Sequence, residues 1–106
     1  MSALNRKEQL EQMLEQEPND VFLNYALDME FLATNHFKEA KLQFEKTLRL
    51  NPSYLPCFYQ LGQVLEKLNQ PNEAINYYKQ GLEVAKSQNN TKALGEINEA
   101  LWMLED

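Results

Sequence analysis

The chain has 106 residues, of which 43% are hydrophobic and 25% are charged. This composition supports one compact core and excludes both a disordered chain and two independently folded cores. Sixteen acidic and ten basic side chains give a net charge of −6, and a negative surface repels phosphate backbones and anionic lipids, so we expect neither nucleic acid nor a membrane as a partner.

The cellular compartment is indicated by three features of the sequence. Cys57 is the only cysteine, so an intramolecular disulfide is impossible and a reducing compartment is favoured. The first twelve residues contain no apolar run of the kind found in signal peptides, and no stretch approaches the ~20 apolar residues of a membrane-spanning helix. We therefore expect a cytoplasmic protein.

Apolar residues recur at helical spacing in six segments, and Pro18, Pro52 and Pro71 fall between such segments. Proline is kept out of helix interiors, so this distribution is typical of an all-α protein. We expect Ser53 to cap the fourth helix and Asn90 or Thr91 to cap the sixth. The predicted helices cover residues 3–16, 20–33, 37–50, 54–68, 71–86 and 91–104.

The sequence repeats itself at one constant spacing. Tyr25 and Tyr59 are one pair of equivalent residues, and the distance between them along the chain is the repeat period. The other pairs at this spacing are Leu27 and Leu61, Asn35 and Asn69, Glu39 and Glu73, and Ala40 and Ala74. Leu10, Phe44 and Tyr78 extend the match upstream, as do Leu14, Leu48 and Leu82. Such a period marks stacked helical hairpins, an α-solenoid. We expect a single domain over residues 1–106, with a helix resembling the second half of a repeat (1–18), two repeats (19–52 and 53–86) and a C-terminal capping helix (87–106).

The repeated residues resemble the tetratricopeptide repeat. The second copy supplies Phe58, Leu61, Gly62, Leu65, Ala74, Tyr78 and Gly81, and the first supplies Leu27, Phe31, Ala40, Phe44, Thr47 and Pro52. The resemblance is strong over residues 20–86 and weak in the flanks. Small residues such as Gly62 and Ala74 permit close approach of two helices.

Asn24 and Asp28 depart from the pattern of the family, which has a large residue at the first position and Gly or Ala at the second. A carboxylate at a close helix crossing needs a partner or forces the helices apart. Either the first hairpin is looser, or Asp28 reaches a hydrogen-bond donor.

The sequence lacks the residue sets that catalysis or metal binding requires. His36 and Cys57 are the only residues of their kinds, so four Cys and His ligands for zinc are not available. All three glycines lie within predicted helices, which excludes a Gly-rich phosphate loop. We expect no enzyme activity, no catalytic residue, no metal site and no cofactor.

The resemblance implies a protein–protein interaction module that binds a peptide or helix in a concave groove. It assigns the groove to Phe22, Tyr25, Met29, Leu32, Tyr59, Gln63 and Glu66. An aromatic stripe on a helix can equally belong to the core, so both interpretations stay open. The cationic clamp that some relatives use for a chaperone's C-terminal carboxylate is missing, and a hydrophobic or mildly basic segment is the expected ligand.

The alternative is a structural module that self-associates as a homodimer or forms part of a longer array. Trp102 and Met103 lie off the apolar stripe of the last helix, where they either fray or contact a second copy. Two hairpins are few for a stable array, which adds weight to this alternative.

Overall fold

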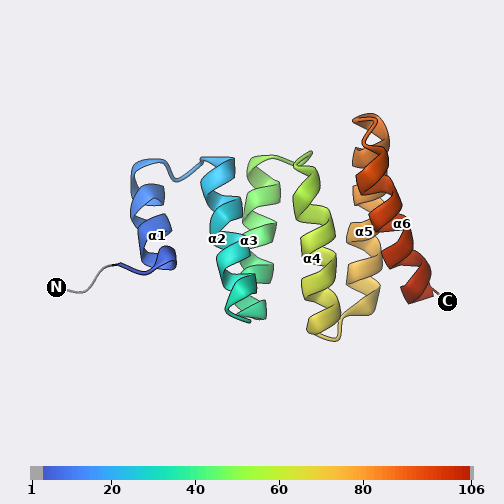
Figure 1. Cartoon of the computed structure of the whole chain (residues 1–106), viewed down its shortest axis with the longest axis horizontal. Coiled ribbons are helices and arrows are strands. Elements are labelled where there is room, and N and C mark those ends of the chain that lie inside the picture. Colours follow the sequence, from blue (N-terminus) through green and yellow to red (C-terminus); the bar gives the residue numbers. More distant parts are fainter. Residues whose placement is uncertain (1–3, 106) are drawn as a thin grey trace. The chain divides into compact units, whose positions relative to one another are not determined.

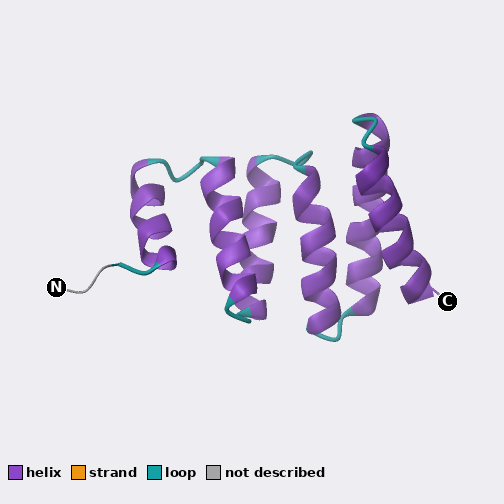
Figure 2. Cartoon of the chain, viewed as in Figure 1, coloured by secondary structure: helices purple, strands orange, loops and turns teal. Residues whose placement is uncertain are grey.

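The computed structural model describes residues 4–105, which form six helices and no strand. The helices are α1 (Arg6–Gln16), α2 (Val21–Ala33), α3 (Phe37–Leu50), α4 (Leu55–Lys67), α5 (Pro71–Ser87) and α6 (Thr91–Glu105) (Figures 1 and 2). The predicted all-α fold of tandem helical hairpins with an additional helix at each end is confirmed. The predicted start of the first helix, Ala3, lies outside the described residues, and the helix begins at Arg6 because Asn5 caps it.

The chain divides into two compact units, Met1–Pro52 and Ser53–Asp106. In the first unit α2 packs against both α1 and α3, and in the second unit α5 packs against both α4 and α6. Each unit therefore has a central helix with a neighbour on either side.

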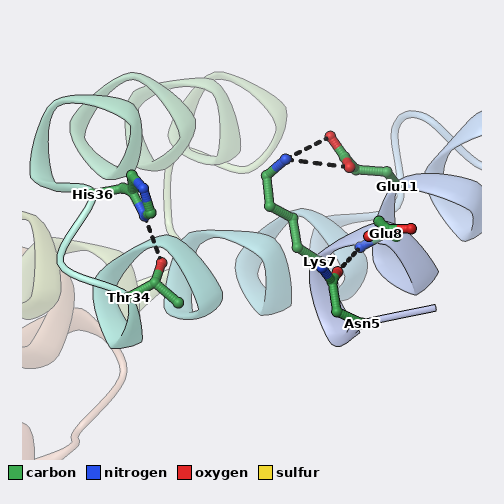
Figure 3. A network of polar contacts seen from close by, with 6 residues as sticks. All are labelled: Asn5, Lys7, Glu8, Glu11, Thr34 and His36. Carbon is green, nitrogen blue, oxygen red and sulfur yellow. Dashed lines mark hydrogen bonds and ion pairs between the residues drawn. The ribbon is translucent and has the colours of Figure 1, made fainter. Parts of the chain in front are cut away.

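Side chains that accept backbone hydrogen bonds define several of the helix starts. Asn5 Oδ1 accepts from the Glu8 amide at 2.8 Å (Figure 3), and Asp20 Oδ1 accepts from the Leu23 amide at 2.8 Å. Asn90 Oδ1 accepts from the Ala93 amide at 3.0 Å, which confirms Asn90 as the cap of α6. Each such bond satisfies an amide that the helix leaves without a partner.

The predicted Ser53 cap is wrong. Tyr54 occupies the cap position of α4, one residue later, and it makes no side-chain cap bond. Pro56 has no N–H to offer at this helix start, and the Cys57 amide already donates to the Tyr54 carbonyl at 3.1 Å. At this helix start, one amide that a capping side chain could bind is therefore missing and another is already engaged.

Three turns contain an asparagine in the left-handed conformation: Asn35 (φ 60°), Asn69 (φ 60°) and Asn89 (φ 54°). In each turn the following amide donates back across the helix end, as His36 does to Phe31 and Gln70 to Leu65. This is the Schellman closure of a helix, which favours Gly or Asn at the left-handed residue. The asparagines therefore end α2, α4 and α5 sharply.

Exposed polar contacts lie at the surface of the first unit (Figure 3). Lys7 Nζ lies 3.4 Å from both carboxylate oxygens of Glu11, and His36 Nδ1 lies 2.7 Å from the Thr34 hydroxyl. His36 is thus an exposed residue of the turn between α2 and α3.

Small residues bring the helices of the second unit close together. A Cβ atom on Gly62 would lie 2.2 Å from Cε1 of Tyr78, and one on Gly81 would lie 2.8 Å from Cβ of Phe58. Ala74 is fully buried, as is Ala40 in the first unit. The small side chains thus occupy the interior that the repeat pattern predicts for them.

Candidate functional site

The two residues that depart from the family pattern form a buried polar network between α2 and α3. Asn24 Oδ1 accepts from Gln43 Nε2 at 2.8 Å, and the Asn24 amide nitrogen donates to the Pro18 and Asp20 carbonyls. Asp28 Oδ2 lies 2.9 Å from the Thr47 hydroxyl. Asp28 therefore reaches a hydrogen-bonding partner across the hairpin, as the second of the two interpretations requires.

The protonation of Asp28 follows from its burial. Burial raises the pKa of its carboxyl from the ordinary 3.8 to about 8, although the hydrogen bond with Thr47 and the charge of Lys46 act in the opposite direction. Thr47 also lies 3.0 Å from the Gln43 carbonyl, which can only accept. The Thr47 hydroxyl donates to Asp28 Oδ2, and burial of the carboxyl outweighs this contact, so the neutral form of Asp28 is favoured. Asp28 is fully buried and is part of the interior.

The predicted groove residues of the first unit differ in their exposure. Phe22 is 71% exposed, whereas Tyr25, Met29 and Leu32 are half-buried. The Tyr25 ring packs edge-on against Phe44 with a centroid distance of 6.2 Å. Tyr25 thus contributes to the core of the hairpin while part of its surface stays accessible.

In the second unit, the predicted groove residues lie together around one hollow between α4 and α6. The hollow has a volume of about 280 Å³. It is lined by Tyr59, Gln63, Glu66, Glu96, Glu99, Ala100 and Met103. Met103, predicted as a self-association contact, therefore shares a surface with the groove residues.

Two residues that line this hollow, Gln63 and Glu66, are hydrogen-bonded to a buried tyrosine of α5. The Tyr78 hydroxyl donates to Glu66 Oε2 at 2.5 Å and accepts from Gln63 Nε2 at 2.6 Å. Burial, together with the hydrogen bond to Glu66, raises the pKa of Tyr78 above its ordinary value of 10. The neutral phenol thus fixes the orientation of Gln63 and Glu66 from behind.

Three carboxylates, those of Glu66, Glu96 and Glu99, line the hollow, and none of its lining residues is basic. Tyr59 and Met103 add apolar surface beside them. Carboxylates accept hydrogen bonds from ammonium and guanidinium groups, so the hollow suits a cationic side chain flanked by apolar ones.

Glu96, Glu99 and Ala100 were not predicted from the sequence, because the last helix was interpreted only as a cap. The sequence did contain a signal for these residues. Glu96 follows Gln63 at the same spacing at which Glu99 follows Glu66. This spacing is one residue shorter than the spacing from Tyr25 to Tyr59, and the difference concealed the correspondence.

Trp102 lies on a different side of α6 from Met103. It is 70% exposed and borders a second hollow with Lys79, Leu82, Asn98, Leu101 and Glu105. Lys79 Nζ lies 3.4 Å from Glu105 Oε1 at its edge. The two residues predicted together for self-association thus belong to separate surfaces.

Other reactive groups lie apart from these hollows. Cys57 is buried, as predicted, and forms no disulfide within the described residues. Among residues 4–105, no group of three or more His, Cys, Asp or Glu side chains is arranged to hold a metal ion. Within the same range, no helix combines the length and apolar character needed to cross a bilayer.

Comparison with known proteins identifies relatives by sequence and by structure. A family model described as tetratricopeptide repeat matches residues 55–88. The crystal structure of a tetratricopeptide repeat domain protein from Salinibacter ruber is 35% identical, with a TM-score of 0.77, and the match covers 81% of this chain and 97% of that one. No curated protein sequence matches at a significant level.

Two more distant structures share the fold. A protein of Bordetella parapertussis is 23% identical with a TM-score of 0.86, and the match covers 97% of this chain and 90% of that one. A MamA mutant is 22% identical with a TM-score of 0.72, and the match covers 92% of this chain and 54% of that one.

Proposed function

The chain belongs to the tetratricopeptide repeat family, and on this premise we propose that it is a protein-interaction module that binds a basic, partly apolar segment of a partner protein. The main contact surface is the hollow between α4 and α6. One observation carries the proposal: three residues assigned to the groove by family correspondence line a single hollow whose charged groups are all carboxylates. The same correspondence assigns Phe22, Tyr25, Met29 and Leu32 of α2 to partner contacts.

The chemistry of the hollow sets the nature of the ligand. A Lys or Arg side chain can place its charged head against Glu96 and Glu99 while its methylene groups lie along Tyr59 and Met103. Each exposed ion pair contributes little, about 0–1 kcal/mol, so binding depends on several such contacts and weakens with salt. A carboxylate-terminated ligand, such as a chaperone tail, meets repulsion here.

The proposal is tested with two fluorescein-labelled peptides of equal length, one alternating Lys with Leu and the other alternating Glu with Leu. Fluorescence anisotropy should show saturable, salt-sensitive binding of the Lys peptide only. A Glu96→Gln, Glu99→Gln double variant should weaken it about tenfold, which corresponds to ~1.4 kcal/mol. Tyr59→Ala should also weaken it, because apolar contact area is lost.

The matched control is Glu83→Gln. Glu83 is an exposed glutamate of α5 that lies 3.5 Å from Lys86 and does not line the hollow. It should leave binding unchanged. Equal binding of both peptides, or a double variant that binds as tightly as the wild type, would contradict the proposal.

Members of this family serve in general as non-catalytic scaffolds, and we propose the same role for this chain. We also propose a cytoplasmic location. It is supported by the single cysteine, Cys57, because one cysteine allows no intramolecular disulfide and a reducing compartment is then favoured. A second candidate function is self-association, favoured by the exposure of Trp102.

A further inference from the structure

We propose that α6 of one copy pairs with α1 of a second copy to complete a helical hairpin, so that the chain assembles head to tail. Of the residues involved, Glu99 also lines the hollow proposed for peptide recognition, whereas Gly95, Trp102, Arg6, Leu10 and Met13 lie outside it. Three observations support this assembly: the repeat identity of α6, an open face at Gly95 and the complementary character of α1.

The last helix repeats the first helix of the preceding hairpin at a constant spacing. The corresponding pairs are Leu61 and Leu94, Gly62 and Gly95, Gln63 and Glu96, Val64 and Ile97, Glu66 and Glu99, and Leu68 and Leu101. The structure supports this register, because Gln63 and Glu66 of α4 line the same hollow as Glu96 and Glu99 of α6. The α6 helix is therefore a first helix of a repeat.

The face of α6 that a second helix of the repeat would cover is open. At Gly62, an added Cβ atom would lie 2.2 Å from the Tyr78 ring of α5, whereas at Gly95 it would meet nothing within 4 Å. Asn98 and Trp102, one and two turns further along this face, are exposed. Within residues 4–105, no helix fills the notch at Gly95.

Helix α1 is the complementary case: it matches a second helix of a repeat, and within residues 4–105 no first helix of the same repeat forms a hairpin with it. Leu10 and Met13 of α1 precede Tyr78 and Gly81 of α5 by twice the spacing from Tyr25 to Tyr59, so α1 is a second helix of a repeat. Leu10 is buried in a cluster with Leu23 and Leu27 of α2. Met13 remains 51% exposed, whereas Gly81, its counterpart, is buried against Phe58 of α4.

The hairpin of α4 and α5 provides the register for the pairing. There Gly62 faces Tyr78, and the two helices run in opposite directions. Transferred to α6 and the α1 helix of a second copy, this register places Gly95 opposite Leu10. One turn away on each helix, it places Glu99 opposite Arg6.

The charges favour a second copy as the occupant. Arg6 and Lys7 lie at the start of α1, and the exposed glutamates at positions 99 and 105 lie in the second half of α6. Antiparallel pairing brings these opposite charges together, and it brings the Arg6 end of α1 towards the exposed Trp102 ring, where a cation can lie over the indole. Arg6 now lies 3.6 Å from Glu30 with 65% of its side chain exposed, so it remains available.

The test is sedimentation velocity over a range of protein concentrations at low salt. A contact between two different surfaces joins successive copies until a ring closes, so the average mass should rise with concentration to at least twice 12.4 kDa. Gly95→Leu should remain monomeric at the same concentrations because the added side chain fills the notch. It should keep its helicity, since nothing within the chain obstructs it.

The control is Asn76→Leu, which adds the same side chain at an exposed position of α5 and should associate as the wild type does. Wild-type protein that stays monomeric throughout would overturn the proposal. Association of Gly95→Leu equal to that of the wild type would overturn it as well.

A charge exchange tests the pairing itself. Arg6→Glu and Glu99→Arg should each weaken association about tenfold, because like charges then meet at the junction. An equimolar mixture of the two variants should recover association, since every contact between unlike copies pairs opposite charges again. A mixture that associates no better than the separate variants would exclude this interface. Glu99 also lines the peptide-binding hollow, whereas Arg6 and Gly95 lie outside it. Loss of assembly in Arg6→Glu and Gly95→Leu with binding of the Lys peptide retained therefore separates the assembly interface from the proposed function.

Discussion

Asp28 and Thr47 meet across the first hairpin at the two positions that Gly62 and Gly81 occupy one period later. The second unit uses glycines to admit the rings of Tyr78 and Phe58. The first unit instead contains two polar side chains that satisfy each other by a hydrogen bond. A neutral carboxyl suits this interior better than an ionised one, because an ionised group would lose far more hydration on burial.

The stability of the protein should depend on the ionisation of Asp28. The folded-state pKa is about 8 and the ordinary value is 3.8. The unfolded state therefore releases this proton at lower pH than the folded state, and the contribution of Asp28 is complete below pH ~4 and falls as the pH rises towards 8. The difference between these two pKa values corresponds to a loss on the order of 5–6 kcal/mol over this range, which urea denaturation would measure.

Asp28→Asn serves as the reference for this pH dependence, because it resembles the neutral carboxyl and cannot ionise. The difference in unfolding free energy between the wild type and the variant should change with pH in the direction described. Parallel pH profiles of the two proteins would contradict the predicted ionisation.

Replacing glycine by alanine should lower the stability of the protein at Gly62 and raise it at Gly95, although the two glycines occupy the same repeat position. At Gly62 the new methyl group meets three atoms of the Tyr78 ring at 2.2–2.7 Å, and the resulting repacking should cost about 1–3 kcal/mol. At Gly95 the space is open, and the better helix propensity of alanine should stabilise by about 0.5–1 kcal/mol. Thermal denaturation at low protein concentration compares the two, and equal shifts would refute the proposed packing.

Ala74→Leu should destabilise the second unit. Ala74 is fully buried on α5, and three additional carbon atoms must displace neighbouring side chains at a cost of about 1–3 kcal/mol. The same substitution at Ala33, the exposed last residue of α2, should change the melting temperature little. An unchanged melting temperature for Ala74→Leu would show that the repeat register is wrong.

Asn69 should tolerate glycine but not valine. Its φ of 60° is accessible to glycine without strain, whereas a β-branched residue there should cost about 1–2 kcal/mol. Asn76, which is exposed within α5, should show the reverse order, because glycine weakens a helix interior more than valine does. Chemical denaturation of the four variants tests this, and the same order at both sites would argue against the left-handed turn.

The sequence by itself determined the six helices and their repeat. Apolar spacing, prolines between segments and the recurrence of Tyr25 at Tyr59 are local or periodic signals, and helix formation depends mainly on such signals. The resemblance built on them predicted the family, and it selected Tyr59, Gln63 and Glu66, which the structure places around one hollow.

The tertiary structure alone decided which side chains meet across helices. Thr47 as the partner of Asp28, the contribution of Glu96 and Glu99 to the hollow, and the separation of Met103 from Trp102 all depend on how each helix is rotated and aligned against its neighbour. A one-residue change in repeat spacing turns a helix face by about 100°, and that rotation is set by packing against the adjacent helix.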